Sequence, residues 1–284
     1  MPEQKSDFEC LSKLNMALFA MNGADRENFG ELLRTVYEAP HGRDVMNETA
    51  FKGYTFMYDV MPGVNGACDF ESKTVKLDAY HRQSDLAPIL VHESAHVLQV
   101  SRLGEKTDNA AEFINALNPR DFIKLNRAFE ADACAHQAAY AYQMKDKNPA
   151  LFEKEMQTPM TRAYAAEMEK SGDETKAMRA GFQAWYGYKK YQDAYEKQFV
   201  LQLTANAKKH PLTQRIAGKD IAALCLSGGK PYMTADFIDK AENVAVSSET
   251  KEALGAIGKS LPVRGKVQTV NSALLKAAIQ TAGR

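Results

Sequence analysis

The chain has 284 residues, of which 45% are hydrophobic, and its 36 lysines and arginines balance 36 aspartates and glutamates. This length and composition suit a soluble globular protein that buries a substantial core. The zero net charge gives no electrostatic reason to expect nucleic acid as a partner. Every apolar run is shorter than the ~18 residues of a membrane span, so we expect no membrane anchor.

The N-terminus and the cysteines bear on the cellular compartment. The segment MPEQKSDFECLSK carries acidic residues where a secretory leader would have a basic region and then an apolar run. We therefore expect a cytoplasmic protein, although a leaderless export route would be invisible to this argument. Cys10, Cys68, Cys134 and Cys225 are scattered without C-x-x-C spacing, which predicts neither a disulfide framework nor a thiolate metal site.

The apolar periodicity predicts an α+β fold that is mostly helical, with one small sheet. Two or three helices are expected in the region of residues 7–52, and the clearest of them cover residues 6–21 and 24–39. Short strands are expected within 54–60 and 66–80, immediately before the most apolar segment of the chain.

Helices dominate the remainder of the chain. The segments with helical composition and spacing are 86–103, 127–144, 150–170, 174–190 and 191–208. We expect residues 1–208 to form the main domain. Residues 209–284 are expected to form a C-terminal helical extension, which either packs on that domain or makes a small appendage.

One predicted helix, LAPILVHESAHVLQVSRL at 86–103, is apolar on almost every side except for a single polar stripe. His92, His96 and Gln99 share one helix face at i, i+4 and i+7, with Glu93 one step round from His92. Two imidazoles and a carboxylate are costly to bury unless each has a strong partner, and a divalent metal with bound water suits all three. The H-E-x-x-H string on such a helix predicts a zinc site.

The flanking residues also indicate a helix. Ser84 is a suitable N-cap, Asp85 places a favourable charge in the first turn, and Gly104 is a suitable C-terminal stop. Within the stripe, Gln99 either forms a hydrogen bond near the metal or lines the wall of the cleft.

Catalytic zinc takes three protein ligands and leaves one position open, so a third ligand is required. The Ala-rich helix at 127–144 offers two alternatives. Glu130 and Asp132 are two positions and about 200° apart, so they cannot both face one metal. His136 shares the face of Asp132. The third ligand is therefore either Glu130 or a member of the Asp132 and His136 pair.

The combination of HESAHVLQ on one helix and FEADA on the next resembles the zincin superfamily of HExxH metallopeptidases, specifically the gluzincin type. The metzincin variant would need Gly at position 99 and His at position 102, where this chain has Gln99 and Arg102. Over residues 54–144 the chain is most similar to uncharacterised bacterial metallopeptidase families. The resemblance implies a zincin-like domain, with an edge strand near Thr74–Leu77 that could pair with an extended peptide.

The resemblance also implies roles for individual residues. His92, His96 and Glu130 would bind Zn²⁺, and Glu93 would act as general base for a metal-bound water that hydrolyses peptide bonds. Gluzincins often carry an acidic residue one turn after the glutamate ligand, where this chain has Cys134. The donor that would stabilise the oxyanion stays open among these residues: Tyr140, His136, His210 and Arg127.

Peptides or protein segments are the substrates that this prediction implies, and the oligomeric state is not predicted. The alternative is a non-catalytic zincin-fold interaction protein with a structural or vestigial metal site. The presence of Glu93 favours the enzyme, because a decayed enzyme could lose this proton acceptor at little structural cost. A third hypothesis is a helical binding module in which the motif is accidental.

Overall fold

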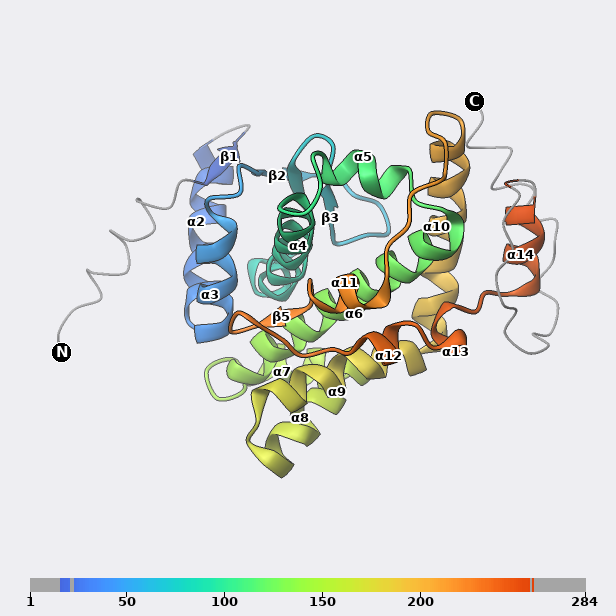
Figure 1. Cartoon of the computed structure of the whole chain (residues 1–284). Helices are drawn as coiled ribbons and strands as arrows, with labels where there is room; N and C mark the ends of the chain where they lie inside the picture. The colour runs from blue at the N-terminus through green and yellow to red at the C-terminus, as the bar shows by residue number, and fades with distance from the viewer. Residues whose placement is uncertain (1–15, 21–22, 256, 258–284) are drawn as a thin grey trace, which may run out of the picture. The chain divides into compact units, whose positions relative to one another are not determined.

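The computed structural model describes residues 16–20, 23–255 and 257, and it has the predicted α+β character, mostly helical with a small sheet (Figure 1). These residues group into two compact units. Unit 1 comprises the chain up to Glu105 together with Asp132–Gly181, and unit 2 comprises Lys106–Ala131 together with the chain from Phe182 onward. The division falls inside helix α6 (Pro119–Gln143), which is one continuous helix.

Unit 1 contains a four-stranded sheet whose strands lie in the order β1-β2-β4-β3. Strand β1 runs parallel to β2, and β2 runs parallel to β4. Strand β3 is antiparallel to β4, with Gly66 opposite Leu77 and Cys68 opposite Val75. The strands are β1 (Ala17–Phe19), β2 (Thr55–Asp59), β3 (Gly66–Asp69) and β4 (Thr74–Asp78).

The expectation of an edge strand at Thr74–Leu77 is wrong. Strand β4 lies between β2 and β3, and β3 is the outer strand on that side of the sheet, with β1 at the opposite edge. The reason is a tight turn in which the Asp69 carboxylate accepts hydrogen bonds from the backbone nitrogens of Glu71 and Ser72. This turn folds β3 and β4 against each other, so the sheet edge on the side of β4 belongs to Gly66–Asp69.

The expectation of a helix over 6–21 is also wrong for the part of that range that the structure describes. Ala17–Phe19 forms strand β1, whereas residues 6–15 lie outside the described residues. Leu18 packs on the core of unit 1, so pairing with β2 satisfies the backbone while burying this side chain. The second expected helix is confirmed as α2 (Gly23–Tyr37), and α3 (Pro40–Thr49) follows it.

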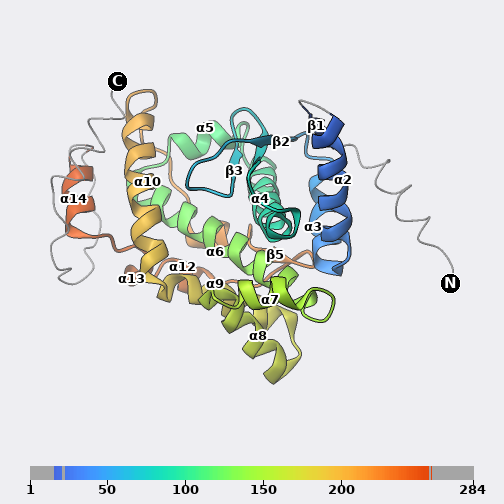
Figure 2. The ribbon, with the colours of Figure 1, turned by 180° about the vertical axis from the view of Figure 1, so that it is seen from behind.

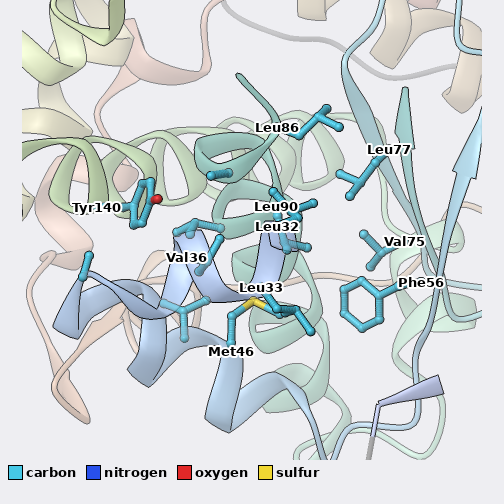
Figure 3. Close-up of a cluster of buried hydrophobic side chains, with 14 of the residues drawn as sticks. Leu32, Leu33, Val36, Met46, Phe56, Val75, Leu77, Leu86, Leu90 and Tyr140 are labelled. Carbon is cyan, nitrogen blue, oxygen red and sulfur yellow. The ribbon is translucent and has the colours of Figure 1, made fainter. Parts of the chain in front are cut away.

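Helix α4 (Gln83–Gly104) is the centre of unit 1. It packs against α2 and α3 on one side and against β3 and β4 on the other, and both views of the ribbon show α2 and α3 beside it (Figures 1 and 2). Figure 3 shows Leu86 and Leu90 of α4 in one buried cluster with Leu32 of α2 and Leu77 of β4. Burying each such leucine contributes about 1.5–3 kcal/mol. The apolar side chains of α4 are therefore part of the hydrophobic core of unit 1.

The helix predicted over 150–170 is two helices, α7 (Pro149–Glu155) and α8 (Pro159–Ser171). The break has a local cause, because Pro159 starts a new helix and the Thr158 side chain accepts a hydrogen bond from the Thr161 backbone nitrogen. The predicted helices over 174–190 and 191–208 correspond to α9 (Glu174–Gly187) and α10 (Lys189–Ala207).

Unit 2 is organised around a buried arginine on α6. The Arg127 guanidinium donates to the backbone oxygens of Asn243 and Ala245 and pairs with the Glu196 carboxylate at 3.2 Å. Short helices and strands follow residue 209, whereas residues 258–284 lie outside the described residues. The smaller elements of unit 2 are α5 (Ala110–Asn115), α11 (Gly218–Ala222), β5 (Leu226–Ser227), β6 (Lys230–Pro231), α12 (Ala235–Ile238), α13 (Ala241–Val244) and α14 (Ser248–Gly255).

The domain boundary expected at residue 208 stays a prediction. Among the described residues, no helix combines the length and apolar character needed to cross a membrane. Three cysteines in the described part of the chain are free thiols: Cys68, Cys134 and Cys225.

Helix α4 starts at Gln83, one residue before Ser84, so Ser84 is not the N-cap that the sequence predicted. Arg82 is the N-cap, so Ser84 lies within the first turn of the helix, where its side chain is exposed. Ser84→Ala should therefore change the free energy of unfolding by less than about 0.5 kcal/mol in urea denaturation. A decrease of about 1 kcal/mol or more in the free energy of unfolding would contradict this prediction and would indicate that Ser84 is the N-cap.

Candidate metal centre

The motif residues lie where α4 is buried on all sides. The helix is otherwise apolar there, and four polar side chains are buried in it: His92, Glu93, His96 and Gln99. The i, i+4 spacing places the His92 and His96 rings on one face, with centroids 4.9 Å apart and ring planes nearly perpendicular. The prediction of two neighbouring buried imidazoles is confirmed by this geometry.

Helix α6 brings a carboxylate to the two imidazoles. Within the described residues, His92, His96 and Glu130 are the group that could hold a metal, with one ligand atom from each lying within 4.8 Å of the others. The Asp132 and His136 pair is not part of this group. Asp132 accepts a hydrogen bond from Gln99, and His136 shares a hydrogen bond with His41. Of the two alternatives for a third ligand, the structure brings Glu130 to the motif histidines.

Gln99 orients the ring of His96. Its side-chain oxygen lies 2.9 Å from Nδ1 of His96, and its nitrogen donates to Oδ2 of Asp132 at 2.6 Å. An amide oxygen only accepts, so Nδ1 of His96 carries the proton and Nε2 keeps its lone pair. Of the two roles considered for Gln99, the hydrogen bond beside the site is the one that the structure has.

His92 has a second, similar arrangement. Its Nδ1 lies 3.1 Å from the side-chain oxygen of Gln137, whose nitrogen donates to Oε2 of Glu155 at 2.9 Å. Cys134, at the position where gluzincins often have an acidic residue, has its sulfur 4.0 Å from the same His92 nitrogen. Gln137 thus provides the hydrogen bond that a thiol provides poorly.

Sequence reasoning missed Gln137 and Glu155. Gln137 lies seven residues after Glu130, so both occupy one face of α6, and this spacing could have identified it. Glu155 lies on α7, and no local pattern links it to the motif. It is buried, and burial raises the pKa of its carboxyl group, a rise that the hydrogen bond from Gln137 opposes.

These residues fit a bound divalent metal. Two imidazole nitrogens and one carboxylate oxygen are the donor set of many catalytic zinc sites. Both Nδ1 atoms face amide oxygens, so the Nε2 atoms are the ones that keep lone pairs for coordination. The donors also lie close enough together for small side-chain rotations to bring them around one ion.

Glu93 is held against strand β3. A Cβ atom added to Gly66 would lie 2.9 Å from Cγ and 2.9 Å from Oε1 of Glu93, so the absence of a side chain at Gly66 makes room for this carboxylate. Burial, and after it the negative charge of Glu93, raises the pKa of the Cys68 thiol on the same strand. Both observations place the Glu93 carboxylate beside the outer strand of the sheet.

Three of the four side chains considered as oxyanion donors make contacts elsewhere. The Tyr140 hydroxyl donates to the Thr35 backbone oxygen, and Arg127 binds the groups described in unit 2. His136 pairs with His41. For His210 the structure adds no contact that bears on the site, so the donor stays unassigned.

Two imidazoles and a glutamate that converge, with a second glutamate beside them, define a candidate metal-dependent hydrolase. Residues 10–234 match the family model described as "Putative metallopeptidase family (DUF6782)". Because the match covers more than half of the chain, the chain belongs to this family of metallopeptidases. No curated protein and no solved structure matches the chain.

The raised pKa of Glu155 predicts how stability depends on pH. The folded chain binds this proton more tightly than the unfolded chain, so Glu155 adds stability as the pH falls through its folded pKa toward 4.5. Glu155→Gln lacks this effect. The measurement is urea denaturation of both proteins. The free energy of unfolding of the wild type should increase relative to that of Glu155→Gln as the pH is lowered from 7 to 4.5.

The matched control is Glu153→Gln, which changes an exposed glutamate on the same helix. This variant should follow the wild type across the pH range. A difference for Glu155→Gln that stays constant or falls in acid would contradict the prediction.

Proposed function

We propose that this metallopeptidase is a zincin of the gluzincin type, in which His92, His96 and Glu130 hold Zn²⁺ and Glu93 is the general base for hydrolysis of peptide bonds. The observation that carries the proposal is the convergence of three ligand atoms within 4.8 Å on α4 and α6, with Glu93 next to the first histidine. Zinc is favoured because two imidazoles and one carboxylate form a common catalytic zinc donor set.

When bound, zinc would supply Lewis acidity that polarises the substrate carbonyl and makes water a stronger acid. Glu93 would then accept the proton of the attacking water and pass it to the leaving amine. Its place supports this role, since the carboxylate is buried beside β3 and is one step round the helix from the ligand face. The hydrogen bonds that His92 and His96 donate from Nδ1 to the side-chain oxygens of Gln137 and Gln99 support this role, because they leave both Nε2 atoms available for the metal.

The outer strand supports an extended peptide or protein segment as substrate. Strand β3 pairs with β4 on one side, and no described strand pairs with its other edge. A substrate that added a strand there would place its backbone beside Gly66, and therefore beside the Glu93 carboxylate. Backbone pairing would explain recognition of a peptide without a demand for one particular side chain.

The first test compares metal content and peptide cleavage. Glu93→Gln should keep its zinc, measured by elemental analysis, but should lose activity on a peptide library by about 10²-fold or more. His96→Ala should lose both zinc and activity. Glu153→Gln, an exposed substitution of the same kind, should keep both.

Two outcomes would contradict the proposal. A wild-type protein that holds zinc but shows no cleavage dependent on Glu93 would indicate the interaction protein with a structural metal. A wild-type protein that holds no metal after refolding with excess zinc would indicate that the motif is accidental.

The second test concerns the space between β3 and α4. Gly66→Ala would place a methyl group 2.9 Å from the Glu93 carboxylate and 2.7 Å from Cγ2 of Ile89, so the carboxylate must move. We expect kcat/KM to fall by about tenfold or more while zinc content is unchanged, because a small displacement of a general base is costly. Ala67→Ser is the control, since successive strand residues point to opposite faces. Full activity in a folded Gly66→Ala variant would argue against Glu93 as the base.

A further inference from the structure

A row of polar side chains runs through unit 1 from the motif to the surface. Each member contacts the next, and all are buried except the last, which is 46% exposed. The members in order, called the relay below, are His96, Gln99, Asp132, His136, His41 and Glu174.

The distances along the relay show how it is connected. Oδ1 of Asp132 lies 3.8 Å from Nε2 of His136, and Nδ1 of His136 lies 2.9 Å from Nε2 of His41. Nδ1 of His41 then lies 3.3 Å from Oε1 of Glu174. The relay therefore joins elements that are far apart in sequence: α3, α4, α6 and α9.

Asp132 determines which way the Gln99 amide faces. A carboxylate only accepts hydrogen bonds, so at 2.6 Å it requires the amide nitrogen of Gln99. A reversed amide would put two oxygens against each other at that distance. The amide oxygen is consequently left facing Nδ1 of His96. Without Asp132, the amide could turn and offer its nitrogen to His96, which would favour the tautomer with the proton on Nε2.

The two further histidines explain how a fully buried carboxylate can serve this purpose. Burying a charge is costly unless it is paired. The His136 ring lies beside Asp132, and the His41 ring lies between His136 and the Glu174 carboxylate, so each buried group from Asp132 to the surface has a polar partner.

We propose that Gln99 and Asp132 are positioning residues that fix His96 as the tautomer with the proton on Nδ1, so that Nε2 is ready to bind metal. The inference rests on the proposed role of His96 as a ligand. It goes beyond that role because it assigns a function to two residues that do not touch the metal or the substrate, and it applies to the protein before metal binds.

The hydrogen bonds that orient His92 differ from those that orient His96. Those of His92 also use a glutamine and a buried glutamate, but the glutamate carboxylate has a raised pKa because of burial. Asp132 instead has the His136 ring as a partner, with Oδ1 3.8 Å from Nε2. The two ligand histidines are therefore oriented by similar amides that are held in different ways.

The experiment measures the His96 tautomer directly in the metal-free full-length protein. Long-range ¹H–¹⁵N spectra of ¹⁵N-histidine-labelled protein distinguish protonation on Nδ1 from protonation on Nε2, and His96→Ala assigns the signal. The wild type should show His96 with the proton on Nδ1. Gln99→Met removes the acceptor, and Asp132→Asn lets the amide face either way, so both variants should gain Nε2–H signal.

The same variants are then titrated with zinc alone. Loss of the orienting contact should raise the zinc Kd by about 10- to 100-fold. Asp121→Asn is the control, because it removes the charge of another buried aspartate on α6 that bonds to Asn118 and Lys124 instead. This control should retain the wild-type tautomer and the wild-type Kd.

The results separate this inference from the proposed function. If the folded Gln99→Met and Asp132→Asn variants keep His96 with the proton on Nδ1, the inference is overturned, whatever the enzyme does. An unchanged zinc Kd in both variants would overturn it too. If instead the tautomer and the zinc Kd change as expected but the wild type cleaves no peptide, the positioning role stands and the proposed peptidase activity fails. Circular dichroism and thermal unfolding show which variants are folded.

Discussion

The structure of unit 1 depends on the burial of polar side chains in the middle of an apolar helix. Each buried polar group without a partner would cost about 2–7 kcal/mol, a large fraction of the stability of a domain. Helix α4 resolves this by dividing its faces. Its apolar faces pack against α2, α3 and the sheet, whereas His92 and Gln99 form hydrogen bonds with polar groups of α6, and His96 forms one with Gln99. The fold and the candidate site are therefore two results of one arrangement.

The polar contacts continue well beyond the three proposed ligands. Each motif histidine is bonded to a glutamine, and each glutamine is bonded to a buried carboxylate. Such chains of hydrogen bonds hold rings in a fixed orientation, which matters for a metal site because affinity depends on the direction of the lone pair. The same contacts tie α3, α4, α6, α7 and α9 together, so the site and its support cannot be separated from the packing of unit 1.

The outer strand, β3, bears on the proposed general base and on the proposed binding of a peptide. Strand β3 lies against the Glu93 carboxylate because Gly66 has no side chain. It also carries the backbone edge at which an extended peptide could pair. One short strand therefore affects both the position of the proposed base and the place where a substrate would bind. This arrangement would align a peptide bond with the Glu93 carboxylate.

The sequence by itself determined the features that depend on local periodicity. It predicted the helices at 24–39, 86–103, 174–190 and 191–208 to within a few residues. It also predicted the apolar character of α4 and the shared face of His92 and His96, because a helix fixes the spacing of its side chains. Only the tertiary structure decided which carboxylate on α6 approaches those histidines, that Ala17–Phe19 is a strand, and that β3 rather than β4 is at the edge. It also supplied Gln137, Glu155, and the relay through His136 and His41. These features depend on contacts between segments distant in the chain, and such contacts are set by how whole elements pack, which no short window of sequence contains.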